Sequence, residues 1–205
     1  MKHKSQSVSN LAGDESESIA DARVWRTRKK INGAFVKLLF HRSYQNLRVS
    51  DITRKAAVGR ATFYAHFDSK EDLLRTQIEQ VVIPMLKASL DSPFLIDCRA
   101  LFSHVRAAPQ LFRAIMSEGV GSGSHVVHDA MEVWLDKVLP AQKPVAGRLP
   151  PVLVKRFILS TLLSIISHSL QPGVTDSAEA MQNQFERLVS SGLSASKSLA
   201  THQIQ

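Results

Sequence analysis

A short run near residue 64 carries polar groups beside two aromatic side chains that are at helical spacing. Phe63 and Phe67 are four residues apart, so on a helix they lie on one face and can pack into a core. The polar groups outside this face belong to Thr62, Tyr64 and His66. Arg60 opens the run, and a guanidinium can hydrogen-bond O6 and N7 of guanine together. The pattern predicts a short helix whose outer face holds a polar partner.

Positive charge gathers around this run. Residues 23–75 include 13 Lys and Arg but only 4 Asp and Glu, a net charge of +9, whereas the whole chain carries +8. A domain-sized cluster of positive charge is typical of proteins that bind a phosphate backbone, although polybasic segments also bind anionic lipid. Charge alone therefore leaves both partners open.

A longer amphipathic helix is predicted before the run, over 24–41. Its apolar stripe consists of Ile31, Ala34, Phe35, Leu38 and Leu39, spaced at i, i+3, i+4, i+7 and i+8. Its first turns carry Arg26, Arg28, Lys29 and Lys30. Cations at a helix N-terminus oppose the helix dipole, so this arrangement favours a nearby phosphate.

Turn and capping signals predict a helix, a tight turn and a second helix around the run. We expect Ser50 to cap a helix over 51–57 and Gly59 to give the following turn its conformational freedom. A helix over 60–66 follows. Ser69, with Asp72 three residues later, predicts the capped start of the next helix.

The chain divides into a disordered polar arm over 1–22, a helix-turn-helix domain over 23–76 and a larger helical domain over 77–205. Further signals predict a kink at Pro84, helices beginning near Pro93 and at Pro109, a loop over 119–124, and helices over 125–139, 150–170 and 177–193. The expected fold is all-α with about nine helices.

Residues 52–74, ITRKAAVGRATFYAHFDSKEDLL, resemble the N-terminal DNA-binding domain of the tetracycline-repressor (TetR) family, and the likeness covers roughly residues 26–76. It is carried by Thr62, Tyr64, His66, Phe67, Ser69, Lys70, Glu71, Asp72 and Leu73. Ala57 and Ala61 stand where the family often has glycine. The resemblance implies that Arg60, Ala61 and Thr62 face base edges, while Tyr64, His66 and Lys70 contact phosphates. We expect Arg28 and Ser50 at the same DNA interface.

The resemblance also implies a homodimer on a palindromic double-stranded DNA operator and a small-molecule effector bound by the helical domain. The helix over 150–170 is apolar nearly all round, so it needs cover either from a second copy or from its own monomer. Residues expected at the dimer interface are Phe157, Ile158, Leu162, Ile165, Phe185 and Leu188. Bulky residues expected to line the effector pocket are Phe102, His104, Met116 and Trp134.

Other chemistry has weaker signals. His125 and His128 share a helix face, but a zinc site needs three or four ligands and no further ligand is recognisable, so we expect no metal. Cys98, the lone cysteine, is expected to be inert. Lys155 and Arg156 interrupt the longest apolar region and leave a stretch far shorter than the roughly 20 residues that span a bilayer, so no membrane partner is expected.

The sequence contains no recognisable nucleophile elbow, paired catalytic carboxylates or cofactor loop, so we expect neither enzyme activity nor a cofactor. A helical enzyme and a helical protein-interaction module are the alternative functions. The favoured function is a cytoplasmic, ligand-responsive transcriptional regulator, most often a repressor.

Overall fold

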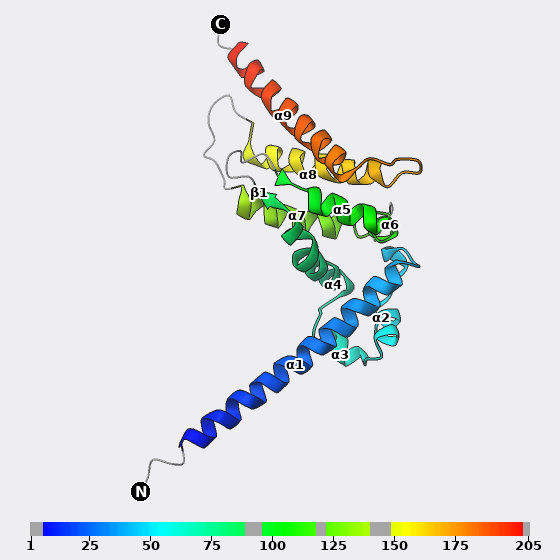
Figure 1. Ribbon diagram of the computed structural model, residues 1–205, viewed down its shortest axis with the longest axis vertical. Coiled ribbons are helices and arrows are strands. Elements are labelled where there is room, and N and C mark those ends of the chain that lie inside the picture. The colour runs from blue at the N-terminus through cyan, green and yellow to red at the C-terminus, as the bar shows by residue number, and fades with distance from the viewer. Residues whose placement is uncertain (1–5, 89–95, 118–121, 140–148, 203–205) are drawn as a thin grey trace.

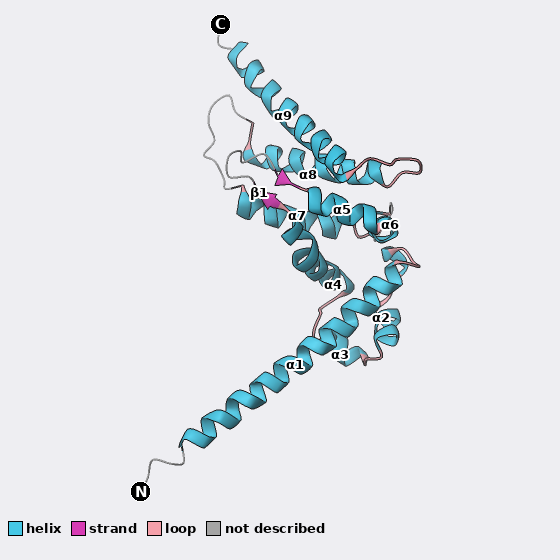
Figure 2. Ribbon diagram, in the orientation of Figure 1, coloured by secondary structure: helices cyan, strands magenta, loops and turns pink. Residues whose placement is uncertain are grey.

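The computed structural model describes residues 6–88, 96–117, 122–139 and 149–202, with side chains over the part of these ranges that lies between 21 and 193. Over this part of the chain there are nine α-helices, which confirms the expected all-α fold (Figures 1 and 2). The helices are α1 (Gln6–Leu39), α2 (Val49–Ala56), α3 (Arg60–Tyr64), α4 (Lys70–Gln77), α5 (Arg99–Ala107), α6 (Pro109–Met116), α7 (Ser124–Val138), α8 (Pro151–Ser169) and α9 (Ala178–His202).

Shorter elements connect some of these helices. They are the 3-10 helices η1 (Tyr44–Asn46) and η3 (Ile83–Met85), the π-helix η2 (Ile78–Val82), and the strands β1 (Lys87–Ala88) and β2 (Ile96–Asp97). The two strands pair antiparallel and were not predicted, because two residues are too few to show an alternating pattern. The helix expected to begin near Pro93 lies partly outside the described residues, and the helical segment that follows starts at Arg99.

The N-terminal arm is helical where we expected disorder. α1 begins at Gln6 and runs unbroken to Leu39, so residues 6–22 belong to it, and in Figure 1 this end extends away from the rest of the molecule. Proline, which would end the helix, does not occur before Pro84 in the chain. The polar composition that suggested disorder is equally compatible with a solvent-exposed helix.

The N-terminal head, residues 23–76, packs around the apolar stripe of α1. The apolar stripe predicted for α1 is buried at Ile31, Ala34, Phe35 and Leu39. Against it pack buried side chains from the following elements, namely Tyr44, Leu47, Ile52, Phe63 and Phe67. Phe63 and Phe67 are 0% and 1% exposed, so the two aromatic residues hold the short third helix in place, as predicted.

Pro84 ends the regular helix that starts at Lys70. α4 changes to π-helical geometry at Ile78 and to 3-10 geometry at Ile83, just before Pro84. Proline has no N–H to donate to the preceding turn, which accounts for the loss of α-helical hydrogen bonding there. The expected kink is thus a change of helix type over eight residues.

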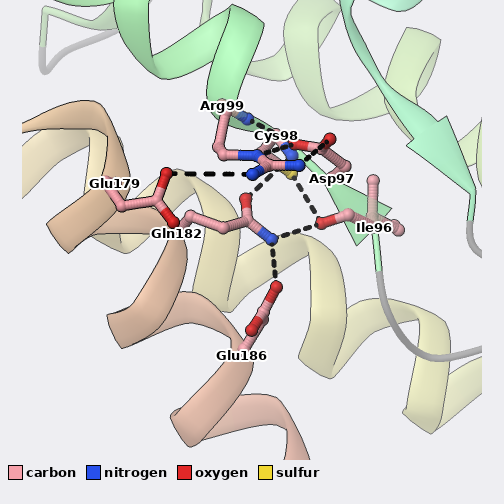
Figure 3. A network of polar contacts seen from close by, with 7 residues as sticks. All are labelled: Ile96, Asp97, Cys98, Arg99, Glu179, Gln182 and Glu186. Carbon is pink, nitrogen blue, oxygen red and sulfur yellow. Dashed lines mark hydrogen bonds and ion pairs between the residues drawn. The ribbon is translucent and has the colours of Figure 1, made fainter.

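α5 to α9 form the larger domain, in which α9 packs against both α5 and α8 (Figure 1). A buried amide ties α9 to the start of α5. Gln182, 3% exposed, accepts a hydrogen bond of 2.8 Å from the Cys98 backbone N–H and donates one of 2.9 Å to the Ile96 carbonyl (Figure 3). Its amide also donates to Glu186 at 2.8 Å. These bonds satisfy backbone groups that would otherwise be buried without partners.

Two helices connect the head to the larger domain. α6 contacts α1 and η1, and α7 contacts α4. Where α7 starts, a β-carbon on Gly123 would lie 2.8 Å from Cγ2 of Ile115 and 3.0 Å from Cδ2 of Leu74. α4, α6 and the start of α7 therefore meet too closely for any residue larger than glycine at position 123.

Candidate nucleic-acid interface

The second helix of the head begins two residues earlier than expected. α2 starts at Val49, and its first turn is closed by Asp51, whose carboxylate accepts a hydrogen bond of 3.1 Å from the Arg48 backbone N–H. Ser50 is therefore not the capping residue, because it already lies inside the helix. It is exposed on the first turn, where a phosphate contact from its hydroxyl stays a prediction.

The turn between α2 and α3 also differs from expectation. Ala57 adopts the left-handed conformation at φ 54° and ψ 47°, and it is the one non-glycine residue with positive φ in the described part of the chain. Gly59 is extended, at φ −72° and ψ 156°, which any residue can adopt. Ala57, and not Gly59, therefore adopts the left-handed conformation, which is unfavourable for a residue with a side chain.

α3 presents the outer face that the sequence predicted, although it ends at Tyr64 rather than at residue 66. Its exposed members are Arg60, Ala61, Thr62 and Tyr64, followed by exposed Ala65. Tyr64 is 48% exposed, and its ring packs edge-on against Phe63 at a centroid distance of 5.4 Å. One edge of the ring is thus fixed while the rest faces solvent, and His66 beside it is half-buried.

Lys70 is largely engaged inside the head. Its ammonium donates hydrogen bonds of 3.0 Å to the carbonyls of Tyr44 and Leu47 and lies 4.2 Å from the centre of the Tyr44 ring. An ammonium has three donors, so only one remains for a phosphate. Burial lowers the pKa of Lys70. The predicted phosphate contact of Lys70 stays a prediction, and its observed role is to tie η1 to the start of α4.

Glu71 completes this connection from the same helical turn. The Tyr44 hydroxyl donates to its carboxylate at 3.2 Å. Burial raises the pKa of Tyr44 above its ordinary value, and the charge of Glu71 adds to the effect. Burial by itself would raise the pKa of Glu71, but hydrogen bonds from its own backbone, Ser69 and Tyr44, together with the charge of Lys70, lower it. This cluster was not predicted, because Tyr44 and Leu47 lie more than 20 residues before Lys70 and Glu71.

Ser69 caps α4 as predicted, since its hydroxyl oxygen accepts a hydrogen bond of 3.1 Å from the Asp72 N–H.

Arg28 from α1 packs on Phe67, which follows the C-terminal end of α3. Its guanidinium carbon is 4.9 Å from the centre of the Phe67 ring. A half-buried Arg28 is thus held next to the end of α3, and its contact with a phosphate stays a prediction.

Two of the four residues expected to line an effector pocket, Phe102 and His104, lie on α5. Phe102 is fully buried in the core, whereas His104 on the same helix packs edge-on against Phe112 of α6 at 5.6 Å. Residues two apart on a helix point about 200° apart, so Phe102 and His104 lie on different faces of α5, and their place in an effector pocket stays a prediction. Met116 and Trp134 are half-buried on α6 and α7.

The residues expected at a dimer interface divide into two groups. Ile158, Leu162, Ile165 and Phe185 are at most 5% exposed and belong to the core of the monomer. Their assignment to the interface was wrong, because α9 and its neighbours cover that face of α8 within one chain. Phe157 and Leu188 are 38% and 55% exposed and remain available to a second copy.

In the described part of the chain, no group of three His, Cys, Asp or Glu side chains is placed so that it could hold a metal ion. His128 instead lies 3.8 Å from Glu132 on α7.

Cys98 is fully buried, and burial raises the pKa of its thiol, with smaller contributions from Asp97 and Glu186. A buried thiol of raised pKa is unreactive, in keeping with the expectation for this residue.

Sequence comparisons match the head, whereas structural comparisons match most of the chain. Residues 34–76 match the family described as bacterial regulatory proteins, tetR family. An uncharacterised HTH-type transcriptional regulator of Bacillus subtilis (strain 168), YxbF, is 45% identical over 67 residues, which are 32% of this chain and 18% of that protein. The chain thus spans less than a fifth of the curated relative that it matches.

Solved structures resemble nearly the whole chain. A TetR transcriptional regulator from Streptococcus agalactiae 2603V has a TM-score of 0.59 at 22% identity, covering 84% of this chain and 98% of that one. The dihydroxyacetone kinase operon activator DhaS has a TM-score of 0.52 at 21% identity, covering 82% and 97%. At such identities the likeness establishes the fold alone. Together, the comparisons show a head that matches the tetR family over residues 34–76 and a chain whose overall fold is like that of solved TetR regulators.

Proposed function

We propose that this protein is a homodimer that binds a palindromic DNA operator and regulates transcription from it. The observation that carries the proposal is the exposed outer face of α3, which is held on a buried Phe63–Phe67 anchor in a head of net charge +9. A rigid helix in a positively charged surface is what insertion into a major groove requires.

Within this interface, we assign base reading to Arg60, Ala61 and Thr62 at the start of α3. Arg60 can bind guanine through two hydrogen bonds, and Ala61 is small enough to allow a close approach or to contact a thymine methyl group. Tyr64, His66, Arg28 and Ser50 are assigned to phosphates, with Lys70 contributing through its remaining donor.

The proposed dimer forms through the outer faces of α8 and α9. α8 is long and apolar enough to cross a bilayer by length and composition, yet a third of its most apolar window is buried in the described part of the monomer. Large apolar residues that remain exposed near its first turns are Leu149, Val152, Leu153 and Phe157, with Leu188 on α9. Lys155, paired with Asp136 of α7, and Arg156 interrupt this surface, which favours a second copy over lipid as its cover.

We also propose that a small-molecule effector bound by the larger domain changes DNA binding. α6 and α7 contact both the head and the larger domain, so a ligand that moves either helix would change the spacing of the two heads in a dimer. Repression is proposed as the sign of regulation, since a dimer on a promoter can exclude polymerase. DhaS, one of the structural neighbours, is an activator, so a reporter gene with and without this protein must test the sign.

Selection of bound sites from random duplex DNA tests the proposed function. The expected result is a two-fold symmetric site whose half-sites lie about one helical turn apart or a multiple of that. Binding should weaken steeply with salt, because phosphate contacts release counterions. Failure to retain DNA at low salt, or retention without any enriched sequence, would contradict the proposal.

A further inference from the structure

Hydrogen bonds join the two ends of the helix-turn-helix segment. α2, the turn and α3 lie between η1 and the start of α4. The ammonium of Lys70 donates to the carbonyls of Tyr44 and Leu47 at 3.0 Å each. The Tyr44 hydroxyl donates to the Glu71 carboxylate at 3.2 Å. These three bonds, which we call the closing contacts, make residues 44–71 a closed loop that carries α3.

The closing contacts attach α4 to a fixed part of the head. Tyr44 is 0% exposed, and its ring packs edge-on against Phe35 of α1 at a centroid distance of 6.3 Å. The Lys70 ammonium lies 4.2 Å from the centre of the same Tyr44 ring. η1 is also contacted by α6 of the larger domain. The start of α4 is therefore tied, by way of Tyr44, to the core that surrounds α1.

α3 depends on its neighbours for its orientation. It has only five residues, Arg60–Tyr64, too few to form a stable helix alone. Phe63 and Phe67 bury one side of it, but apolar burial has no preferred direction. Hydrogen bonds, by contrast, require a defined distance and angle. The closing contacts therefore supply a directional restraint that the two aromatic side chains do not.

The link between α3 and α4 transmits this restraint. Residues 65–69 connect the two helices, and the Phe67 N–H donates to the Phe63 carbonyl at 2.9 Å. At the other end of the link, Asp72 of α4 accepts from the Asp68 N–H at 3.0 Å. Each end of the link is thus hydrogen-bonded to the helix that it joins. A shift at the start of α4 therefore also moves α3.

We propose that the closing contacts position α3 for base reading, with Tyr44 and Glu71 as positioning residues that do not touch DNA. This proposal rests on the proposed function. The bidentate contact assigned to Arg60 tolerates a displacement of only about 0.5 Å. Tyr44 is fully buried, and phosphate repels the Glu71 carboxylate, so neither residue binds the DNA backbone. Their loss should reduce the preference for the operator and leave the phosphate contacts in place.

The test leaves Lys70 unchanged, because its third donor is assigned to a phosphate. Tyr44→Phe removes the donor hydroxyl, and Glu71→Ala removes the acceptor. Glu71→Gln removes the same charge as Glu71→Ala but keeps an acceptor oxygen for the Tyr44 hydroxyl. Ile31→Val, a buried change in α1, weakens the core of the head without removing a hydrogen bond. Circular dichroism and thermal melting identify a temperature at which every protein is folded.

Anisotropy titrations over a range of salt compare the operator selected by the wild-type protein with a mixed-sequence duplex of equal length. Tyr44→Phe and Glu71→Ala should lower the ratio of the two affinities about tenfold, which is the discrimination that one bidentate base contact gives. Glu71→Gln and Ile31→Val should keep the wild-type ratio. The salt dependence of Tyr44→Phe should stay unchanged, because no phosphate contact is lost.

Two results would overturn the positioning role and leave the proposed function intact. One is a wild-type ratio in both Tyr44→Phe and Glu71→Ala. The other is an equal loss in Ile31→Val, which would show that the closing contacts only stabilise the head. A wild-type protein that selects no operator would instead overturn both proposals.

Discussion

The ring of Phe157 in α8 packs directly on Gly192 in α9. A β-carbon at position 192 would lie 2.5 Å from Cζ and 2.9 Å from Cε1 of that ring, closer than real contacts allow. Gly192 therefore lets the two helices approach and holds the exposed Phe157 ring in its place on the proposed dimer surface.

Replacing Gly192 with Ala should displace the Phe157 ring and weaken the dimer. Alanine gains roughly 1 kcal/mol of helix propensity, which offsets part of the clash, so the monomer should lose little stability. Sedimentation and thermal melting measure the two effects separately. Gly33→Ala is the control, since open space surrounds that position in α1. An unchanged dimer in Gly192→Ala would show that Phe157 lies outside the interface.

Leu188→Glu should separate the dimer without unfolding the chain. Leu188 is 55% exposed in the monomer, and a symmetric interface would bury two copies at about 1.5–3 kcal/mol each. The dimer dissociation constant should therefore rise at least about a hundredfold. Asn183→Glu, an exposed change on another face of α9, is the matched control. Leu162→Lys, by contrast, should unfold the monomer, because Leu162 is 1% exposed.

Ala57→Gly should stabilise the head. The left-handed conformation at φ 54° costs a non-glycine residue about 1–2 kcal/mol, and part of that gain is lost to the larger freedom of glycine in the unfolded chain. We expect the free energy of unfolding to rise by about 0.5–1 kcal/mol in denaturant titrations. Gly59→Ala should leave stability unchanged or slightly higher, since its new β-carbon would meet only the Thr62 hydroxyl at 3.7 Å. A less stable Ala57→Gly protein would refute this account of the turn.

Arg60→Ala should relax the sequence preference at one base pair of each half-site. Loss of a bidentate contact to guanine costs about 1–3 kcal/mol at that position and nothing at a mismatched one. Competition titrations with single-base operator variants measure the difference. A uniform loss of affinity on all sequences would show that Arg60 contacts phosphate.

Asp97→Asn should reduce stability above about pH 4 and lose its effect in stronger acid. Arg99 donates hydrogen bonds of 3.0 and 2.7 Å to the carboxylate and lowers the pKa of Asp97 from 3.8 to about 2. A carboxylate with a lowered pKa stabilises the folded state above its unfolded pKa, and this contribution declines as pH falls toward 2. Unfolding curves of both proteins between pH 2 and pH 7 give the difference. A gap that widened in acid would contradict the assignment.

The head was predictable because its signals are local. Helical spacing of apolar residues identified the buried stripe at Ile31 and Phe35, and the Phe63–Phe67 pair identified the anchor of α3. Capping chemistry identified Ser69, since its partner Asp72 is three residues away. Each of these interactions is complete within one turn of helix, so residue type and spacing are enough to reveal it.

Sequence reasoning failed where the deciding contact is distant along the chain. Lys70 appeared free for DNA until η1, 23 to 26 residues earlier, supplied its two carbonyl partners. Ile158 and Leu162 were expected at the dimer interface, yet both are buried within one chain, in which α8 packs against α9. The amide of Gln182 serves backbone groups 84 and 86 residues away.

By itself, then, the sequence determined the class of domain, the charged face of the head and the outward residues of α3. Tertiary structure alone decided which charged and apolar side chains remain available to a partner. The physical reason is that periodicity shows which face of a helix is apolar or charged, whereas burial and pairing depend on the neighbour that the fold places against that face.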